Sequence, residues 1–160
     1  MSKKEAKVWF DGNGKEVEQE DVFKHVMEHA TKNGKVFIGS DSMLRSTHCV
    51  FASAICLHGA DGQSGGRYFF NRKKVDKTKF DVLRLRIMHE VQNSIDVGLE
   101  ILERNPEVDI EIHIDVGTSS RSKTRELVDM MKGWTKSIGF KCKVKPYAWA
   151  STAVADKHTK

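Results

Sequence analysis

The sequence has few cysteines, few prolines and no long apolar run, and each shortage excludes a class of protein. Its 160 residues include only three cysteines, Cys49, Cys56 and Cys142, and two prolines. An odd cysteine count without a CxxC pair excludes a disulfide framework and a cysteine-based zinc site. We therefore expect a reducing, cytoplasmic location. No segment approaches the ~20 consecutive apolar residues of a membrane span, and no apolar run follows the basic N-terminus, so neither a membrane segment nor a signal peptide is expected.

What the sequence does contain indicates one packed domain over residues 1–160. Eight Phe, three Trp and 39% hydrophobic residues argue for a core and against disorder. Lys and Arg number 27 and Asp and Glu 22, so the net charge is 27 − 22 = +5. This mildly basic balance suggests nucleic acid as a partner without requiring it. The alternative for each basic cluster is a solvated face or a strand edge guarded by lysine.

Hydrophobic periodicity predicts alternating helices and strands. Apolar spacing of three or four predicts helices over 20–32, 78–104 and 121–138, and a short helix from about 151, where small residues favour close packing. Apolar or alternating runs predict strands over 35–39, 48–57, 67–73, 109–116 and 140–144. Short connections favour an antiparallel meander for the first three strands, and helical crossovers favour parallel pairing for the last two. The expected fold is an α/β domain with a mixed five-stranded sheet and helices on both faces. Residues 1–34 form an N-terminal extension and 35–160 the core.

Two acids follow apolar strands, at the sheet edge where ligands of α/β folds bind. Asp41 follows residues 36–40, and Asp115 follows residues 110–114. Each is alternatively a turn or capping acid. On the long helix, the angular positions of Glu90 and Asp81 fit a site beside the sheet, and the angle does not choose between them. Asp156 is the one acid of the small-residue tail.

Four such carboxylates suit Mg²⁺ or Mn²⁺, because these ions prefer oxygen ligands. Two ions together activate a water and stabilise the leaving oxygen of a phosphodiester. Clustered carboxylates repel one another, so we expect at least one raised carboxyl pKa in the metal-free protein.

Other polar residues surround these acids in the sequence. His113 shares a strand face with Asp115 and is either an auxiliary group of the site or a hydrogen-bonded structural histidine. Lys157 and His158 adjoin Asp156 and are either auxiliary groups or exposed tail residues. The candidate nucleic-acid-binding residues, which would contact the phosphate backbone, are Arg72, Lys73, Lys74, Thr118, Ser119, Arg121, Lys123 and Lys145.

Five separated motifs together resemble a known family. They are VWFDG at 8–12, FIGSDS at 37–42, Glu90-Val91 with Ser94, IHIDVG at 112–117, and KPYAWAS at 145–151 running into VADK at 154–157. The chain resembles the predicted ribonuclease H-related nucleases of the YkuK type. The resemblance implies a ribonuclease H-like fold and a divalent-metal nuclease. It assigns the metal-holding acids to Asp41, Glu90, Asp115 and Asp156, with Ser42 as an auxiliary residue, and so favours Glu90 over Asp81.

Three functions remain open at this point. The first is a metal-dependent nuclease acting on RNA, an RNA–DNA hybrid or structured DNA. The second is a non-catalytic nucleic-acid-binding module on the same fold. The third is a phosphotransfer enzyme acting on small molecules, for which affinity depends less steeply on salt. The sequence does not indicate the oligomeric state.

Overall fold

The computed structural model describes residues 7–116 and 125–160, which form a mixed α/β fold. The strands are β1 Trp9–Asp11, β2 Glu16–Val17, β3 Lys35–Leu44, β4 His48–His58, β5 Arg67–Asp76, β6 Ile110–Ile114 and β7 Lys141–Val144. The α-helices are α1 Gln19–Thr31, α2 Leu83–Arg104 and α3 Arg125–Ser137. Three short helical segments accompany them: η1 Lys77–Lys79, η2 Ala150–Val154 and η3 Ala155–His158.

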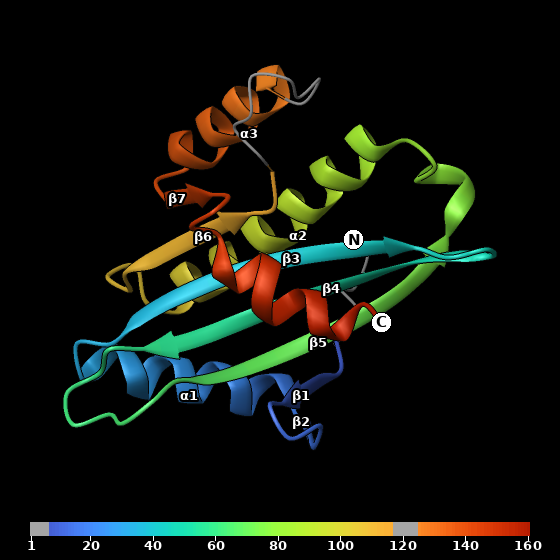
Figure 1. Ribbon diagram of the computed structural model, residues 1–160. Helices are drawn as coiled ribbons and strands as arrows, with labels where there is room; N and C mark the ends of the chain where they lie inside the picture. The colour runs from blue at the N-terminus through green and yellow to red at the C-terminus, as the bar shows by residue number, and fades with distance from the viewer. Residues whose placement is uncertain (1–6, 117–124) are drawn as a thin grey trace.

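The strands form one sheet in the order β2-β1-β5-β4-β3-β6-β7, as Figure 1 shows. β3, β4 and β5 are an antiparallel meander, whereas β6 pairs parallel with β3 and β7 pairs parallel with β6. This confirms the predicted mixed α/β sheet. The predicted count of five strands is wrong, because the N-terminal hairpin of β1 and β2 adds two strands along the outer edge of β5.

Strand β3 is longer than its apolar residues predict. It continues through Ser40, Asp41 and Ser42 to Leu44, so Asp41 lies inside the strand, paired with Ala52 of β4, rather than beyond its end. The Ser40 hydroxyl makes this continuation possible, because it is hydrogen-bonded at 2.7 Å to the hydroxyls of both Ser53 and Ser94. A buried polar side chain that is fully paired does not end a strand.

The two faces of the sheet are covered differently (Figure 1). α1, α2 and α3 pack on one face, around fully buried residues such as Ile38, Ile95 and Ile112. The C-terminal segment, residues 150–158, crosses the other face over β3, β4 and β5. It packs there through its small residues Ala150 and Ala155. In the described ranges, no helix has the length and hydrophobicity needed to cross a membrane.

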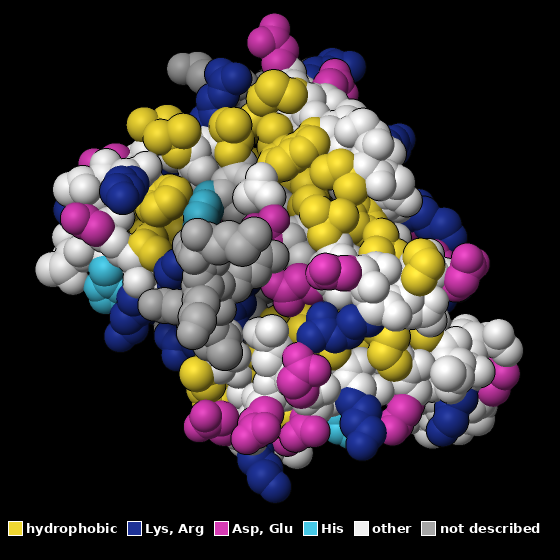
Figure 2. Space-filling model, turned by 180° about the vertical axis from the view of Figure 1, so that it is seen from behind, with side chains coloured by type: hydrophobic (Ala, Val, Ile, Leu, Met, Phe, Trp, Pro, Cys, Tyr) yellow, Lys and Arg dark blue, Asp and Glu magenta, His cyan; other side chains and the backbone are white. Residues whose placement is uncertain are grey.

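The helical face is seen from behind in Figure 2, where a band of apolar side chains runs beside acidic and basic ones. α2 lies on this face, and its apolar spacing buries Ile87, Val91 and Ile95 against the sheet. The helix begins at Leu83, later than the predicted residue 78. Residues 77–79 instead form η1, which Asp76 caps by accepting a 3.0 Å hydrogen bond from the Thr78 backbone N–H.

Candidate functional site

A cavity of about 510 Å³ opens near the carboxyl ends of β3 and β6, beside the first half of α2. Asp41 of β3, Glu90 of α2 and Asp115 after β6 line it together. Arg86 of α2 and Lys145, which follows β7, bring two cations to the same walls. Three acids that are distant in the sequence therefore meet at the sheet edge expected for an α/β ligand site.

Asp41 is the most strongly perturbed acid of this group. Its side chain is 7% exposed. Burial raises the pKa of Asp41 to about 9, helped by a hydrogen bond with the Asp156 side chain and by the charges of Glu90 and Asp115. A hydrogen bond between two carboxyl groups requires a proton on one of them. Asp41 therefore carries a proton at neutral pH.

Glu90 is buried on the side of α2 that faces β3. Burial, with the charge of Asp115, raises the pKa of Glu90 to about 8. The Ser42 hydroxyl opposes this shift by donating a 2.6 Å hydrogen bond to Glu90 Oε1, and Arg86 opposes it by its charge. Asp81, the alternative acid of the sequence, is exposed before the start of α2. The cavity thus takes Glu90 and not Asp81.

Asp115 is paired with a lysine. Lys145 Nζ lies 2.8 Å from Asp115 Oδ1. The hydrogen bond to Asp115 is the main cause of the raised pKa of Lys145, and the charges of Asp41 and Glu90 add to it. Excess negative charge in the cavity is therefore balanced by protons on the buried acids and by this ammonium group.

Asp156 reaches Asp41 from η3 on the opposite face of the sheet from α2. It does not line the cavity, and its Oδ2 lies 3.4 Å from Lys160 Nζ. The docking of the C-terminal segment fixes its position. Gly39 permits that docking, because a Cβ at this position would overlap the backbone of Ala150 and Ser151.

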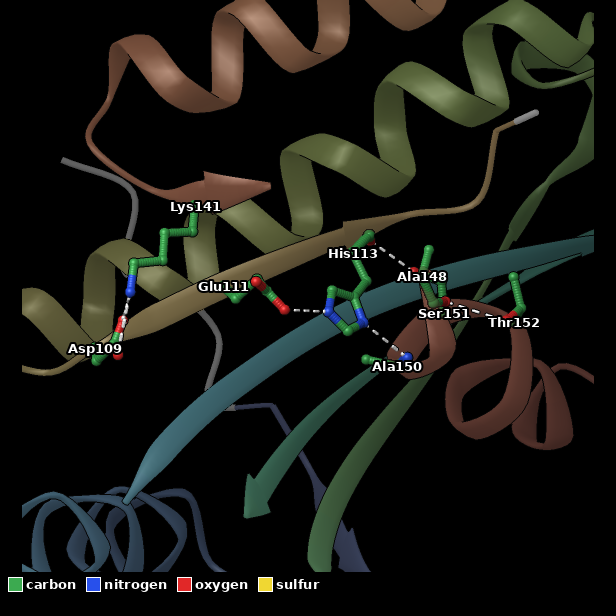
Figure 3. A network of polar contacts seen from close by, with 8 residues as sticks. All are labelled: Asp109, Glu111, His113, Lys141, Ala148, Ala150, Ser151 and Thr152. Atoms are coloured by element: carbon green, nitrogen blue, oxygen red, sulfur yellow. Dashed lines mark hydrogen bonds and ion pairs between the residues drawn. The ribbon is translucent and has the colours of Figure 1, made fainter. Parts of the chain in front are cut away.

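His113 holds the same segment from β6, as Figure 3 shows. Its Nδ1 accepts a 3.0 Å hydrogen bond from the Ala150 backbone N–H, so its Nε2 carries the proton and donates at 2.8 Å to Glu111. The Ser151 hydroxyl donates at 2.6 Å to the His113 carbonyl. Both ring nitrogens of His113 are therefore engaged in hydrogen bonds within the protein. In the described part of the chain, His113 makes no hydrogen bond or ion pair with Asp156. It influences the position of Asp156 only by hydrogen bonding to Ala150 and Ser151 of the same segment.

We call the cavity lined by Asp41, Glu90 and Asp115 the carboxylate cavity. The remaining predicted residues lie outside it or outside the described ranges. His158 stacks on Phe70 with ring centroids 3.5 Å apart and contacts the Tyr68 hydroxyl at 3.0 Å, so it packs onto the sheet. Lys157 is exposed on η3. Thr118, Ser119, Arg121 and Lys123 fall outside the described residues.

The three consecutive basic residues of β5, Arg72, Lys73 and Lys74, do not all point to the same face of the sheet, because side chains alternate along a strand. Lys73 pairs with Phe51, which faces α2, whereas Arg72 and Lys74 face the side of the C-terminal segment. Arg72 Nη2 accordingly lies 3.4 Å from the Lys160 carbonyl oxygen. The run is therefore not one basic surface.

The donors of the cavity suit a hard divalent cation, because they are carboxylate oxygens that crowd and repel one another. Within residues 7–116 and 125–160, however, no three His, Cys, Asp or Glu side chains are arranged to hold a metal ion as they stand. Instead, protonation neutralises Asp41, and the Lys145 ammonium group neutralises Asp115. The carboxylate oxygens are suitable ligands for a divalent cation, but the side chains would have to move, and Lys145 would have to leave Asp115, before they could bind one.

Arg86 is the cavity residue that the sequence reasoning missed. It precedes Glu90 by four residues, the spacing that places two helical side chains on one face. Its Nη1 also donates at 2.7 Å to the Phe80 carbonyl and at 3.2 Å to the Asp81 carbonyl, which ties the start of α2 to the segment before it. The i,i+4 relation to Glu90 is the feature that identifies it.

Comparison with known proteins gives two matches. The sequence model of the family described as "Ribonuclease H-like" matches residues 18–160. A Bacillus subtilis (strain 168) protein, "Uncharacterized protein YkuK", is 25% identical over 138 residues, with 77% of each chain covered. No solved structure matches this chain significantly.

Proposed function

Because the chain belongs to the ribonuclease H-like family, we propose that it is a divalent-metal-dependent nuclease. Its substrates in this proposal are RNA, RNA–DNA hybrids or structured DNA. The carrying observation is the convergence of Asp41, Glu90 and Asp115 on one cavity, with raised pKa values on Asp41 and Glu90. Perturbed acids gathered in a cavity are typical of functional sites.

Two Mg²⁺ or Mn²⁺ ions would be held by the carboxylates of Asp41, Glu90 and Asp115, together with Asp156 from the C-terminal segment. When bound, such ions supply Lewis-acid activation of a water and stabilisation of the leaving oxygen. To hold such ions, the carboxyl groups of Asp41 and Glu90 would have to release their protons, because only the ionised form binds a cation well.

The other residues of the cavity position and balance charge. Ser42 fixes the rotamer of Glu90 through its 2.6 Å hydrogen bond. Lys145, once released from Asp115, is a cation placed to contact a phosphate. Arg86 supplies a second cation on the same wall. A phosphodiester entering the cavity therefore meets two basic side chains beside the acids.

One observation favours a second candidate, a non-catalytic nucleic-acid-binding module. No three acids in the described ranges stand ready to hold an ion, and Lys145 already neutralises Asp115. In that case the acids are structural, and nucleic acid binds through basic side chains alone. Removing acidic charge then leaves affinity unchanged or increases it.

The deciding experiment titrates Mg²⁺ and Mn²⁺ into the protein and into an Asp41→Asn/Asp115→Asn double variant. Thermal stability is followed in each, and labelled single-stranded RNA, RNA–DNA hybrid and branched DNA are supplied as substrates. A Glu126→Gln/Asp129→Asn variant is the matched control, because both residues are exposed acids on α3.

The nuclease proposal predicts stabilisation by metal and metal-dependent cleavage, both lost in the cavity variant and kept in the α3 control. Binding without cleavage, with affinity kept in the cavity variant, would support the non-catalytic module. Absence of both stabilisation and cleavage at millimolar metal would refute the catalytic proposal.

A further inference from the structure

A second cavity, of about 740 Å³, lies on the helical face of the sheet along a different side of α2. Strands β4 and β5 supply its floor through Phe51 and Asn71, and α2 supplies a wall through His89 and Asn93. Among the described residues, none lines both this cavity and the carboxylate cavity. We call it the Asn71 cavity.

One residue of the floor, Asn71, and one core residue beside it, Trp9, carry buried donors without acceptors in the described part of the chain. Asn71 is 8% exposed, and its Nδ2 has no hydrogen-bond partner among the described residues. Trp9 stands directly opposite Asn71 in the β1–β5 register, and its buried Nε1 has no partner there either. Opposed residues of an antiparallel pair share a face. Buried donors are nearly always paired in folded proteins, so the unpaired donor of Asn71, which lines the cavity, indicates a bound group that supplies acceptor atoms.

The wall beside Asn71 is aromatic: the half-buried ring of His89 packs over Phe51, which is only 2% exposed. The rings of Phe51 and His89 meet edge to face with centroids 4.5 Å apart, and Phe80 packs on both. Burial, with the charge of nearby Lys73, lowers the pKa of His89. His89 is therefore a neutral aromatic ring at physiological pH. Such surfaces favour a planar, aromatic ligand group.

Charge is divided across the mouth of the cavity. The cations that line it are Lys7, Arg72, Lys73 and Arg104, of which Arg104 is paired with Glu20 at 2.8 Å and Arg72 reaches toward Lys160. Asp96, Glu100 and Glu103 contribute carboxylates from α2, where Asp96 already accepts a 2.7 Å hydrogen bond from Gln92. Lysine ammonium groups suit a phosphate, and carboxylates accept hydrogen bonds from sugar hydroxyls. The ligand is thus a planar ring with acceptor atoms, joined to hydroxyl groups and an anion.

We propose that the Asn71 cavity binds a nucleotide. Its base lies against the ring of His89 with acceptor atoms toward Asn71, and its phosphate lies at Lys73. An asparagine amide pairs best with adenine, donating to N7 and accepting from the N6 amino group, so adenine is the expected base. The nucleotide is either free or part of a single strand. The inference is independent of the nuclease proposal, because none of the cavity acids Asp41, Glu90 and Asp115 takes part.

The test uses the tryptophan indole N–H signals in nitrogen-15 NMR spectra of the whole protein. The chain has three tryptophans, and a Trp9→Phe variant assigns the signal of Trp9. AMP, GMP, CMP and UMP are titrated without metal, and then unstructured oligoadenylate and oligouridylate of eight nucleotides. The variants are Asn71→Leu, Lys73→Ala and, as a charge-matched control, Lys136→Ala, an exposed lysine on α3.

We expect AMP or oligoadenylate to shift the Trp9 signal. Response to AMP identifies a free nucleotide as the ligand, and response to the oligonucleotide alone identifies a strand. Asn71→Leu should weaken binding about tenfold without lowering the melting temperature, because leucine leaves no unpaired donor. Lys73→Ala should weaken binding and reduce its salt dependence, and Lys136→Ala should do neither.

Two results would overturn the proposal. One is an unshifted Trp9 signal at 10-fold to 1,000-fold excess of every nucleotide and oligonucleotide. The other is binding that neither Asn71→Leu nor Lys73→Ala weakens. Lys73 is exposed, so Lys73→Ala tests the cavity even if Asn71→Leu does not fold. The same titration in the Asp41→Asn/Asp115→Asn variant separates the two proposals, since nucleotide binding should persist there whether or not the nuclease proposal holds.

Discussion

The Asp41→Asn substitution should change how the stability of this protein depends on pH. Burial and neighbouring acids raise the pKa of Asp41 from 3.8 to about 9. The folded protein therefore keeps a proton that the unfolded chain releases above about pH 4. Because the folded state binds more protons, the free energy of unfolding must fall as pH rises from about 4 to about 9. Asparagine has nearly the same shape and does not titrate, so it removes this contribution.

The size of the effect follows from proton counting. One extra proton in the folded state changes the free energy of unfolding by about 1.4 kcal/mol per pH unit. Glu90, with a pKa raised to about 8, adds a slope of the same sign that ends about one pH unit earlier. Between pH 5 and pH 7.5, the Asp41→Asn variant should therefore lose about 3 kcal/mol less stability than the unchanged protein.

The assay is urea unfolding at half-unit steps from pH 5 to pH 8, at constant ionic strength and without divalent metal. Asp81→Asn is the matched control, because Asp81 is an exposed acid just before α2. Its stability should follow the unchanged protein at every pH. Parallel curves for Asp41→Asn and the unchanged protein would refute the buried, protonated state of Asp41, and with it the electrostatic account of the cavity.

Two further predictions concern other parts of the site. Gly39→Ala should displace the C-terminal segment, because the new Cβ overlaps the backbone of Ala150 and Ser151. Hydrogen exchange should then accelerate over residues 150–158 with a loss of about 1–3 kcal/mol, whereas Gly133→Ala, where a Cβ meets nothing within 4 Å, should keep protection there. Lys145→Met should strengthen stabilisation by Mn²⁺ in thermal melts, because its ammonium no longer competes for Asp115. Equal Mn²⁺ responses in Lys145→Met and the control Lys143→Met would contradict this competition.

The sequence predicts the large elements well, since each is long enough to show a period. The apolar stripe of α2 and the alternation of β6 both correspond to observed elements. β1 and β2 have three and two residues, which are too few to show a hydrophobic period, so the hairpin is not among the predicted strands of the sheet. The end of β3 was misplaced because Ser40 and Ser42 interrupt its apolar run. Their hydroxyls are paired by residues far along the chain, Ser94 and Glu90.

The site could be predicted only to the level of single elements. The helical angle alone fits Glu90 and Asp81 equally well. What distinguishes Glu90 in the structure is that it is buried against β3 and hydrogen-bonded to Ser42. The alternation of the strand predicts which face of the sheet carries His113, but it does not predict which segment covers that face. In the structure the C-terminal segment covers it and takes its Nδ1 as an acceptor. Long-range packing of this kind has no local pattern in the sequence.

The C-terminal segment and the charge of the cavity are physically coupled. Asp156 contributes to the cluster only while the segment stays docked on Gly39 and His113. Its carboxyl shares a hydrogen bond with Asp41, which persists only while one of the two is protonated. Loss of that proton without a replacing cation places two negative charges in contact and opposes docking. A cation that bound both carboxylates would remove the repulsion. A shared proton or, in the proposed metal-bound protein, a cation would keep the segment docked, and we expect docking to be weakest at high pH without metal.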